Sequence, residues 1–298
     1  MRLAEKIIVK LKKIKSMKKA IVLLAVATVM CGCSKTVIEN EDIVNVSDSK
    51  RVRFDVSNKG WQVVTRSLDA DGQEMTDLWL FDYMNGELVK TVHKVQGDAD
   101  IATPSVELKY GEHHIYFVAS RGKNPEVSGT TIVWGTPSDT FWKEMTLSID
   151  GKSATSVAVA LDRVVTKLRI SVNDKVPEGT ASVAITPGTW WYGLDYTTGA
   201  AIDSRQDERV ISVPSSFVGT TGQLVLSMFG LSDDDEWTTG LTITAKNGSG
   251  DILGQVQLDD VPFLRNRATE ASGNLFGNTT TFSITLNNEW LEPYTLEW

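Results

Sequence analysis

The chain has 298 residues, with 30 Lys and Arg against 38 Asp and Glu, and a net charge of −8. Eight basic residues and one acidic residue precede Cys33, so residues 33–298 keep 22 basic and 37 acidic side chains, a net charge of −15. This acidic body argues against nucleic-acid binding, which needs clustered Lys and Arg, and against a polybasic membrane-surface patch. The apolar fraction of 41% is enough for a core, and the length indicates about two domains.

The N-terminus has the pattern of an export signal. Lys18 and Lys19 precede an apolar run over residues 20–30, which is shorter than the ~20 residues that cross a bilayer. The run ends at Cys31-Gly32-Cys33, which resembles a bacterial lipobox. We therefore expect residues 1–32 to be a signal peptide, and the alternative is an uncleaved signal anchor. Met17 is an alternative start, because a conventional signal begins there.

Cys33 is the predicted lipidation site and the mature N-terminus. The chain has 2 Cys, Cys31 and Cys33, so the body has none for a disulfide framework or a Cys-based metal site. Residues 33–50 are polar and acidic and should form a lipidated tether. Ser34, in place of Asp, favours the outer membrane by resemblance to Gram-negative lipoproteins.

Apolar and polar residues alternate through most of the body, as in strands with one wet face. About sixteen short strands of this kind, separated by turn residues, predict an all-β fold of two tandem Greek-key or transthyretin-like β-sandwiches. We place these domains at 51–161 and 162–298. The predicted strands include 51–56, 61–65, 77–83, 87–93, 106–110, 114–120, 145–149, 157–161, 167–172, 181–186, 209–213, 223–229, 241–246, 251–258 and 281–286.

Three local signals refine this pattern. Residues 78–81 are apolar on both faces, which predicts a central strand. Asn85-Gly86 supplies the positive φ angles of a tight hairpin. Residues 138–145 are expected to make one or two helical turns, with Ser138 or Asp139 as the cap.

Trp190, Trp191 and Tyr192 are the candidate ligand-binding aromatic residues. On a strand, Trp190 and Tyr192 share one face. Exposed rings would stack on a glycan, whereas the alternative is that one face joins the core and the other meets a neighbouring domain. The sequence has no phosphate loop, nucleophile elbow or metal-spaced His cluster, so we expect no enzyme activity, cofactor or metal.

Several motifs occur in an order that is similar to the fimbrillin superfamily of type V pili. Thr65-Arg66 is followed by DLWLFD at 77–82 and NGELV at 85–89. A third motif spans residues 161–170, with Thr166 where the family usually has Ala, and the last ones are LRNR at 264–267 and GNLF at 273–276. The resemblance is closest to the fimbrillin-A-associated anchor (FimB-like) lipoprotein family.

This resemblance implies a surface-exposed, lipid-anchored outer-membrane protein that acts as a fimbrial anchor or minor structural subunit. Its partners would be other fimbrial subunits, joined by β-strand complementation, and any host or microbial surface ligand is unidentified. Shaft subunits of the family are cut by an Arg-specific protease, and Arg66 resembles that position. Two alternatives stay open: a shaft subunit cleaved after Arg66, or a glycan-binding surface lipoprotein. No catalytic residues carry over.

Overall fold

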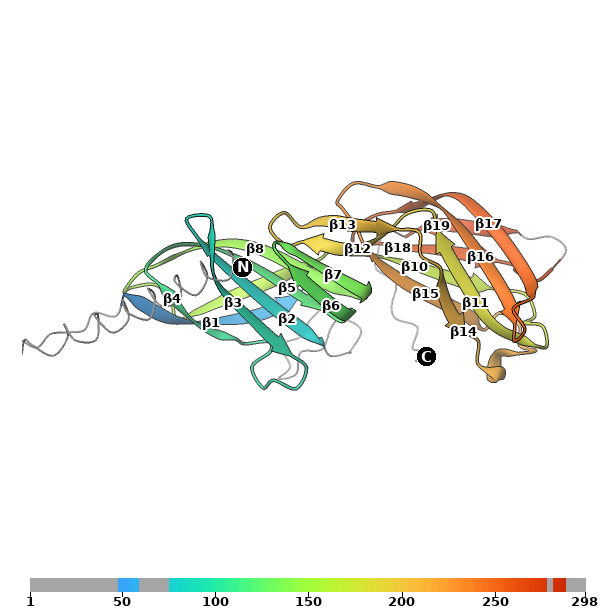
Figure 1. Ribbon diagram of the computed structural model, residues 1–298, viewed down its shortest axis with the longest axis horizontal. Coiled ribbons are helices and arrows are strands. Elements are labelled where there is room, and N and C mark those ends of the chain that lie inside the picture. Colours follow the sequence, from blue (N-terminus) through green and yellow to red (C-terminus); the bar gives the residue numbers. More distant parts are fainter. Residues whose placement is uncertain (1–47, 59–74, 278–280, 288–298) are drawn as a thin grey trace, which may run out of the picture. The chain divides into compact units, whose positions relative to one another are not determined.

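The computed structural model describes residues 48–58, 75–277 and 281–287 (Figure 1). Within these ranges the chain forms nineteen strands and a single turn of 3-10 helix, η1 (Ser215–Phe217), which confirms the all-β sandwich prediction. None of the helical structure in the described ranges is long and apolar enough to cross a membrane.

The N-terminal sandwich is a seven-stranded sheet in the order β3-β2-β5-β8-β9-β1-β4. β8 and β9 pair at two positions only, so the sheet divides there into two layers. Apolar side chains from β1, β4 and β9 share one core with those from β2, β5 and β8. The strands are β1 (Ser49–Asn58), β2 (Asp77–Met84), β3 (Glu87–Val95), β4 (Ser105–Lys109), β5 (Gly111–Ser120), β8 (Thr140–Ile149) and β9 (Ser156–Arg163).

The C-terminal sandwich packs an eight-stranded sheet on a four-stranded sheet around a second core. The larger sheet has β6 (Lys123–Ser128), β7 (Thr131–Thr136), β10 (Val165–Val172), β12 (Trp190–Asp195), β13 (Ala200–Arg205), β15 (Leu224–Leu231), β18 (Ala268–Gly273) and β19 (Phe282–Leu286). The smaller sheet has β14 (Arg209–Ser212), β11 (Thr180–Pro187), β16 (Trp237–Asn247) and β17 (Ile252–Phe263).

The β6–β7 hairpin lies between β5 and β8 in sequence but extends the larger C-terminal sheet, because β7 pairs with β12. A third apolar cluster forms where this hairpin, β2, β5, β12 and β13 meet. In it, the rings of Phe81 and Tyr196 stack with centroids 3.8 Å apart. The hairpin and this cluster join the strands of the two sandwiches into one packed body.

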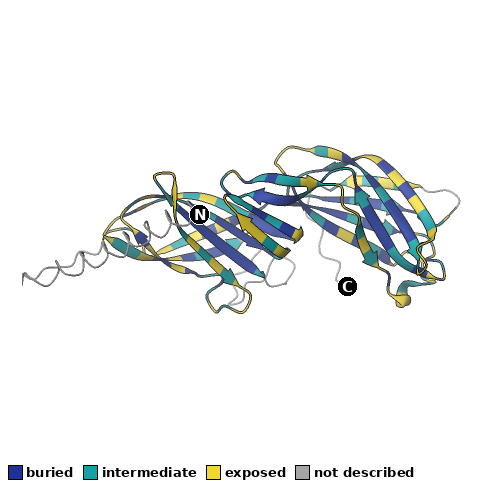
Figure 2. Ribbon diagram, in the orientation of Figure 1, coloured by how far each residue is buried: buried dark blue, intermediate teal, exposed yellow. Residues whose placement is uncertain are grey.

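β2 is buried on both faces, as its sequence predicts. Leu78 and Leu80 lie in the N-terminal core, whereas Trp79 and Phe81 lie in the third cluster. The buried residues of β2 form an almost continuous dark-blue stretch in Figure 2. Two-sided burial therefore follows from the contact with the hairpin and β13, in addition to pairing with β3 and β5.

The Asn85-Gly86 turn joins β2 to β3 as predicted. Asn85 and Gly86 have φ angles of 51° and 81°. Both values lie in the left-handed region that a two-residue hairpin with the sheet's twist requires. The turn thereby sets the pairing of β2 with β3.

The predicted helical turns over 138–145 are wrong, because this segment begins β8. Phe141, Met145 and Ile149 point to the N-terminal core, so the period of two continues through the segment. Asp139 is not a helix cap, because its carboxylate is buried and bound by Arg163. Pairing with β5 along the whole strand outweighs the weak local helix signal.

Candidate functional site

β1, the first described strand, has backbone partners on both sides. Its residues 49–53 pair antiparallel with β4, and residues 53–58 pair parallel with β9. In the segment just before β4, the carbonyls of Pro104 and Ala102 accept the N–H groups of Phe54 and Val56 at 2.9 Å each. β1 therefore has backbone partners on both sides over residues 53–56, and it pairs with β4 alone before this stretch and with β9 alone after it.

The side chains of β1 fill the N-terminal core. Val52 and Phe54 are fully buried and Val56 is 5% exposed. The Phe54 ring meets the Phe117 ring edge-on, with centroids 5.2 Å apart. Without β1, the sandwich would carry an apolar groove between β4 and β9, flanked by unpaired backbone groups, which is a template for another strand. We call this the β1 groove.

The outward face of β1 is polar and connects to both neighbouring strands. Arg53 donates from Nε to Asp55 Oδ1 at 2.8 Å, and the Ser156 hydroxyl on β9 donates to the same carboxylate. The Ser156 hydrogen bond, followed by the Arg53 contacts, lowers the pKa of Asp55, although partial burial opposes the shift. Because its pKa is lowered in the folded state, Asp55 stabilises the fold at pH values above its ordinary pKa. This stabilisation is lost as the pH falls through the pKa of the folded state.

Two of the sequence-predicted site residues, Cys33 and Arg66, lie outside the described residues, as does the predicted strand over 61–65. The predicted strand over 51–56 is part of β1. Because Arg66 follows β1 in sequence, cleavage after Arg66 would separate β1 from the rest of the protein.

The candidate glycan residues are packed inside the protein. Trp190 is fully buried and Tyr192 is 6% exposed, and both belong to the C-terminal core. Trp191 points to the other side of β12, where it packs half-buried against the third cluster. Stacking on a sugar needs an exposed ring face, which Trp190 lacks. This arrangement agrees with the alternative expectation, in which one face of the strand joins the core and the other packs against a neighbouring domain.

The motifs at 264–267 and 273–276 fix chain connections. Arg265 donates to the carbonyls of Ser232 and Gly199 at 2.6 Å each and lies 3.3 Å from Asp234. The carboxylate of Asp174 accepts the backbone N–H groups of Leu275, Phe276 and Gly277 at 2.6–3.1 Å. These motifs thus stabilise the turn before β18 and the segment after it.

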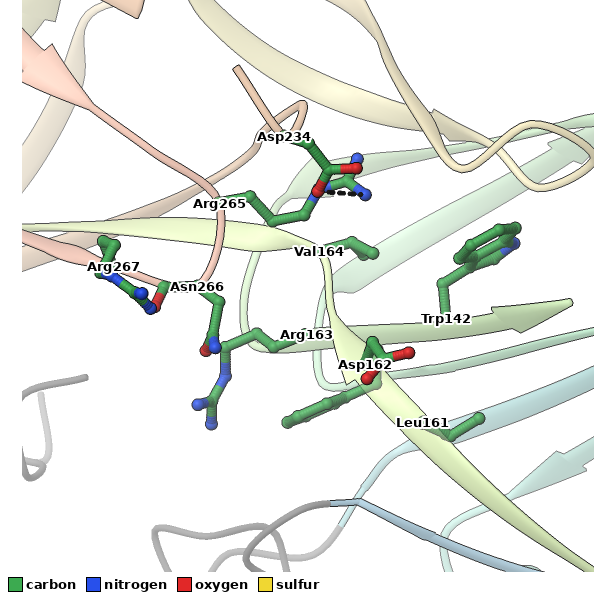
Figure 3. Close-up of a pocket in the computed structure, with 10 residues that line it drawn as sticks. Trp142, Leu161, Asp162, Arg163, Val164, Asp234, Arg265, Asn266 and Arg267 are labelled. Atoms are coloured by element: carbon green, nitrogen blue, oxygen red, sulfur yellow. Dashed lines mark hydrogen bonds and ion pairs between the residues drawn. The ribbon is translucent and has the colours of Figure 1, made fainter. Parts of the chain in front are cut away.

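A buried ion pair and a pocket lie where β9 passes into β10. Arg163 binds Asp139 with two hydrogen bonds, of 2.6 and 2.7 Å. Arg163 also lines a pocket of about 370 Å³ (Figure 3). Sequence reasoning missed both, because the residues come from distant segments. The available signal was the concentration of arginines in the two motifs at 161–170 and 264–267.

These features define the class: an all-β protein of two sandwiches whose first described strand fills the N-terminal core. No family model matches the sequence. No curated protein matches it either.

Several solved structures are similar to this chain. A candidate polysaccharide-binding protein of Bacteroides thetaiotaomicron has a TM-score of 0.52 at 12% identity, covering 82% of this chain and 98% of that one. A candidate adhesin of Bacteroides ovatus has a TM-score of 0.50 at 12% identity, covering 78% and 88%. The fimbrial anchor protein Mfa2 of Porphyromonas gingivalis has a TM-score of 0.47 at 10% identity, covering 83% and 100%. The first two similarities show that this chain has the fold of those proteins.

Proposed function

We propose that the protein is a lipid-anchored subunit at the base of a fimbria or a related adhesive structure on the outer-membrane surface. The observation that carries the proposal is that β1 fills the N-terminal core and has backbone partners on both sides. The motif order of the fimbrillin superfamily and the fold shared with a candidate adhesin support it.

Strand complementation explains how such a subunit joins a neighbour. In this mode an added strand gains affinity from main-chain hydrogen bonds and register from alternate side-chain pockets. The β1 groove has both features, because Val52, Phe54 and Val56 alternate with polar residues. A strand from another subunit that replaced β1 would need apolar residues at the same spacing.

The fate of Arg66 separates two roles. If the bond after Arg66 is cut, the lipid on Cys33 and β1 leave together, and the body becomes a polymerising shaft subunit. If Arg66 is spared, the lipid and β1 both stay, and the protein anchors a filament. We favour the anchor, because the sequence resemblance is closest to the anchor family. The mass of the surface-exposed species in cells that contain the Arg-specific protease distinguishes the two, since a lipid-free species that begins at Ser67 identifies a shaft subunit.

The Cys33→Ser variant is expected to lose membrane attachment or to accumulate as an unprocessed precursor. Two acyl chains on the diacylglyceryl group hold a protein stably, because each buried CH₂ contributes about 0.8 kcal/mol and a single chain is marginal. Membrane fractionation and intact-mass measurement test this expectation. Cys31→Ser is the matched control and should fractionate like the wild type; normal processing of Cys33→Ser would refute the lipid anchor.

A labelled peptide with the sequence of residues 49–58 is expected to bind the chain that begins at Ser67 and to leave the full chain unlabelled. The reason is that the full chain already holds its own β1 in the groove. Fluorescence anisotropy measures the binding. A peptide with Phe54→Asp is the matched control, because it places a charge in the apolar core. Equal binding of the two peptides, or no binding of either, would contradict strand complementation at this site.

A further inference from the structure

The β1 groove accepts apolar side chains at every second position of the strand that fills it. Val52, Phe54 and Val56 all point into the N-terminal core. This alternation excludes a shift of the strand by one residue, because such a shift would turn every side chain to the other face. A shift by two residues keeps the alternation, and among these side chains only the larger ring of Phe54 opposes it. Polar contacts at the rim of the groove can supply the missing discrimination.

The start of β1 is held by acceptors in the turn between β8 and β9. The Lys50 ammonium donates to the carbonyl of Ser153 and to that of Gly151, the latter at 3.4 Å. The carboxylate of Asp150 accepts the Ser153 hydroxyl at 2.8 Å and is part of the same turn. These acceptors belong to the groove, so they are also available to another strand that replaces β1. This end of the groove therefore favours a cation, since hydrogen bonds that include an ion are stronger than neutral ones.

The β4 side of the groove adds a negative charge at the same end. Arg51 lies directly opposite Glu107 in the antiparallel register of β1 and β4. Opposite charges at directly opposed positions of two strands attract each other. The Glu107 carboxylate also accepts the hydroxyl of Ser49 at 2.7 Å. Acceptors therefore flank the start of the groove both on β4 and in the β8–β9 turn.

The β9 side of the groove supplies a hydrogen-bond donor further along the strand. The hydroxyl of Ser156 donates to the Asp55 carboxylate at 2.5 Å. The residue directly opposite Asp55 on β9 is Ala158, whose methyl side chain cannot form a hydrogen bond with the carboxylate. A carboxylate at this position gains a charge-assisted hydrogen bond, whereas an apolar side chain would leave the hydroxyl without it.

We infer that the β1 groove selects its partner strand by charge pattern as well as by apolar residues. The partner would carry basic side chains at the positions of Lys50 and Arg51, a carboxylate at the position of Asp55, and apolar side chains at the three inward positions of β1. This inference rests on the proposed function, because the partner is the strand of another subunit that replaces β1.

The charge pattern also fixes the register of the strand. A shift of β1 by two residues would place either Asp48 or Val52 where Lys50 now lies. The first brings an acid to the acceptors of the β8–β9 turn, and the second leaves them without a cation. Neither shift keeps a carboxylate where Asp55 lies, so both shifted registers lose the polar contacts at the two ends.

The test uses the full chain with Phe54→Asp, whose own β1 is expected to leave the groove because it would bury a charge. This chain is refolded from urea with an excess of a labelled peptide of residues 49–58, and the captured peptide is measured by size-exclusion chromatography. The control peptide exchanges Lys50 and Asp55, so its composition, net charge and apolar residues are unchanged. We expect capture of the native peptide to be about tenfold higher, as is usual for hydrogen bonds to charged groups.

A second measurement keeps the wild-type groove and its own β1. Lys50→Met should lower the urea midpoint of the full chain, whereas Lys109→Met, an exposed lysine on the neighbouring β4, should leave it unchanged. Asp55→Ala and Ser156→Ala should each lower the midpoint. Their double variant should lose less than the sum of the two, because both substitutions remove the same hydrogen bond.

Each measurement has a result that would overturn the inference. Equal capture of the two peptides would exclude selection by charge and leave strand complementation standing. Capture of neither peptide, by a chain that circular dichroism shows to be folded, would overturn strand complementation together with this inference. In the wild-type background, equal midpoints of Lys50→Met and Lys109→Met, or strictly additive losses from Asp55→Ala and Ser156→Ala, would show that the rim contacts do not hold the strand.

Discussion

Replacing Trp190 by Ala is expected to lower the free energy of unfolding by about 3–5 kcal/mol, as is usual for a fully buried Trp. The Trp190 side chain is 0% exposed, and its Nε1 donates to the Phe229 carbonyl at 2.8 Å. Its ring packs edge-on against Phe263, with centroids 5.1 Å apart. A Cβ on Gly230 would lie 2.6 Å from this ring, so the indole occupies the space that the glycine leaves. Urea unfolding followed by circular dichroism measures the loss.

The adjacent Trp191 supplies a matched control for this prediction. It has the same side chain on the same strand, but it is half-buried and packs against the third cluster. Trp191→Ala should therefore cost clearly less than Trp190→Ala. Equal losses from the two substitutions would show that the burial of Trp190 does not determine its contribution.

Asp139→Ala is expected to destabilise the protein by about 3–5 kcal/mol, because it removes the carboxylate that accepts two short hydrogen bonds from a buried guanidinium. Arg163 and Asp139 form two short hydrogen bonds, and their side chains are 8% and 0% exposed. The guanidinium also lies over the Phe141 ring, 4.8 Å from its centroid, so it is held on two sides. Thermal and chemical unfolding of the variant measure the effect.

The double variant Asp139→Leu/Arg163→Met separates the cost of removing one member of the pair from the loss of the pair itself. Replacing both members of a buried pair by apolar residues is often close to neutral. The double variant should therefore be more stable than Asp139→Ala. If it is equally unstable, the loss comes from packing around β8 and β9, and the ion-pair explanation fails.

The strands with strong alternation could be predicted from the sequence, and those with weak or mixed patterns could not. β1, β2 and β10 follow the expected pattern because one or both faces are filled with large apolar residues. β6 contains Pro125 and is largely exposed, and it exists because β7 supplies its pairing partner. β18 has small residues and no large apolar side chain, so its own sequence does not predict a strand. It forms a strand because it pairs with β10 on one side and β19 on the other.

The two candidate sites differ in how much of each could be predicted from the sequence. The inward face of β1 was evident from the alternation of Val52, Phe54 and Val56 with charged residues. The sequence did not predict the parallel pairing of β1 with β9, which lies about a hundred residues later in the chain. The residues of a strand show which face is buried, but they do not specify which distant strand it pairs with. The pocket also depends on segments that are distant in sequence, because the end of β9 and the turn at Arg265–Arg267 both line it.

The parallel pairing of β1 with β9 has a mechanical consequence. A subunit held by its N-terminus is pulled at the start of β1, whereas the end of β9 leads directly into β10 and the C-terminal sandwich. Tension applied at these two opposite ends slides the two strands past each other. Because the hydrogen bonds lie across the strands, such a shear loads them simultaneously, and the first rupture must break several at once. The same contacts opened from one end would fail in sequence, at a lower force. The geometry of β1 therefore suits the role proposed above, in which the protein holds a filament at its base.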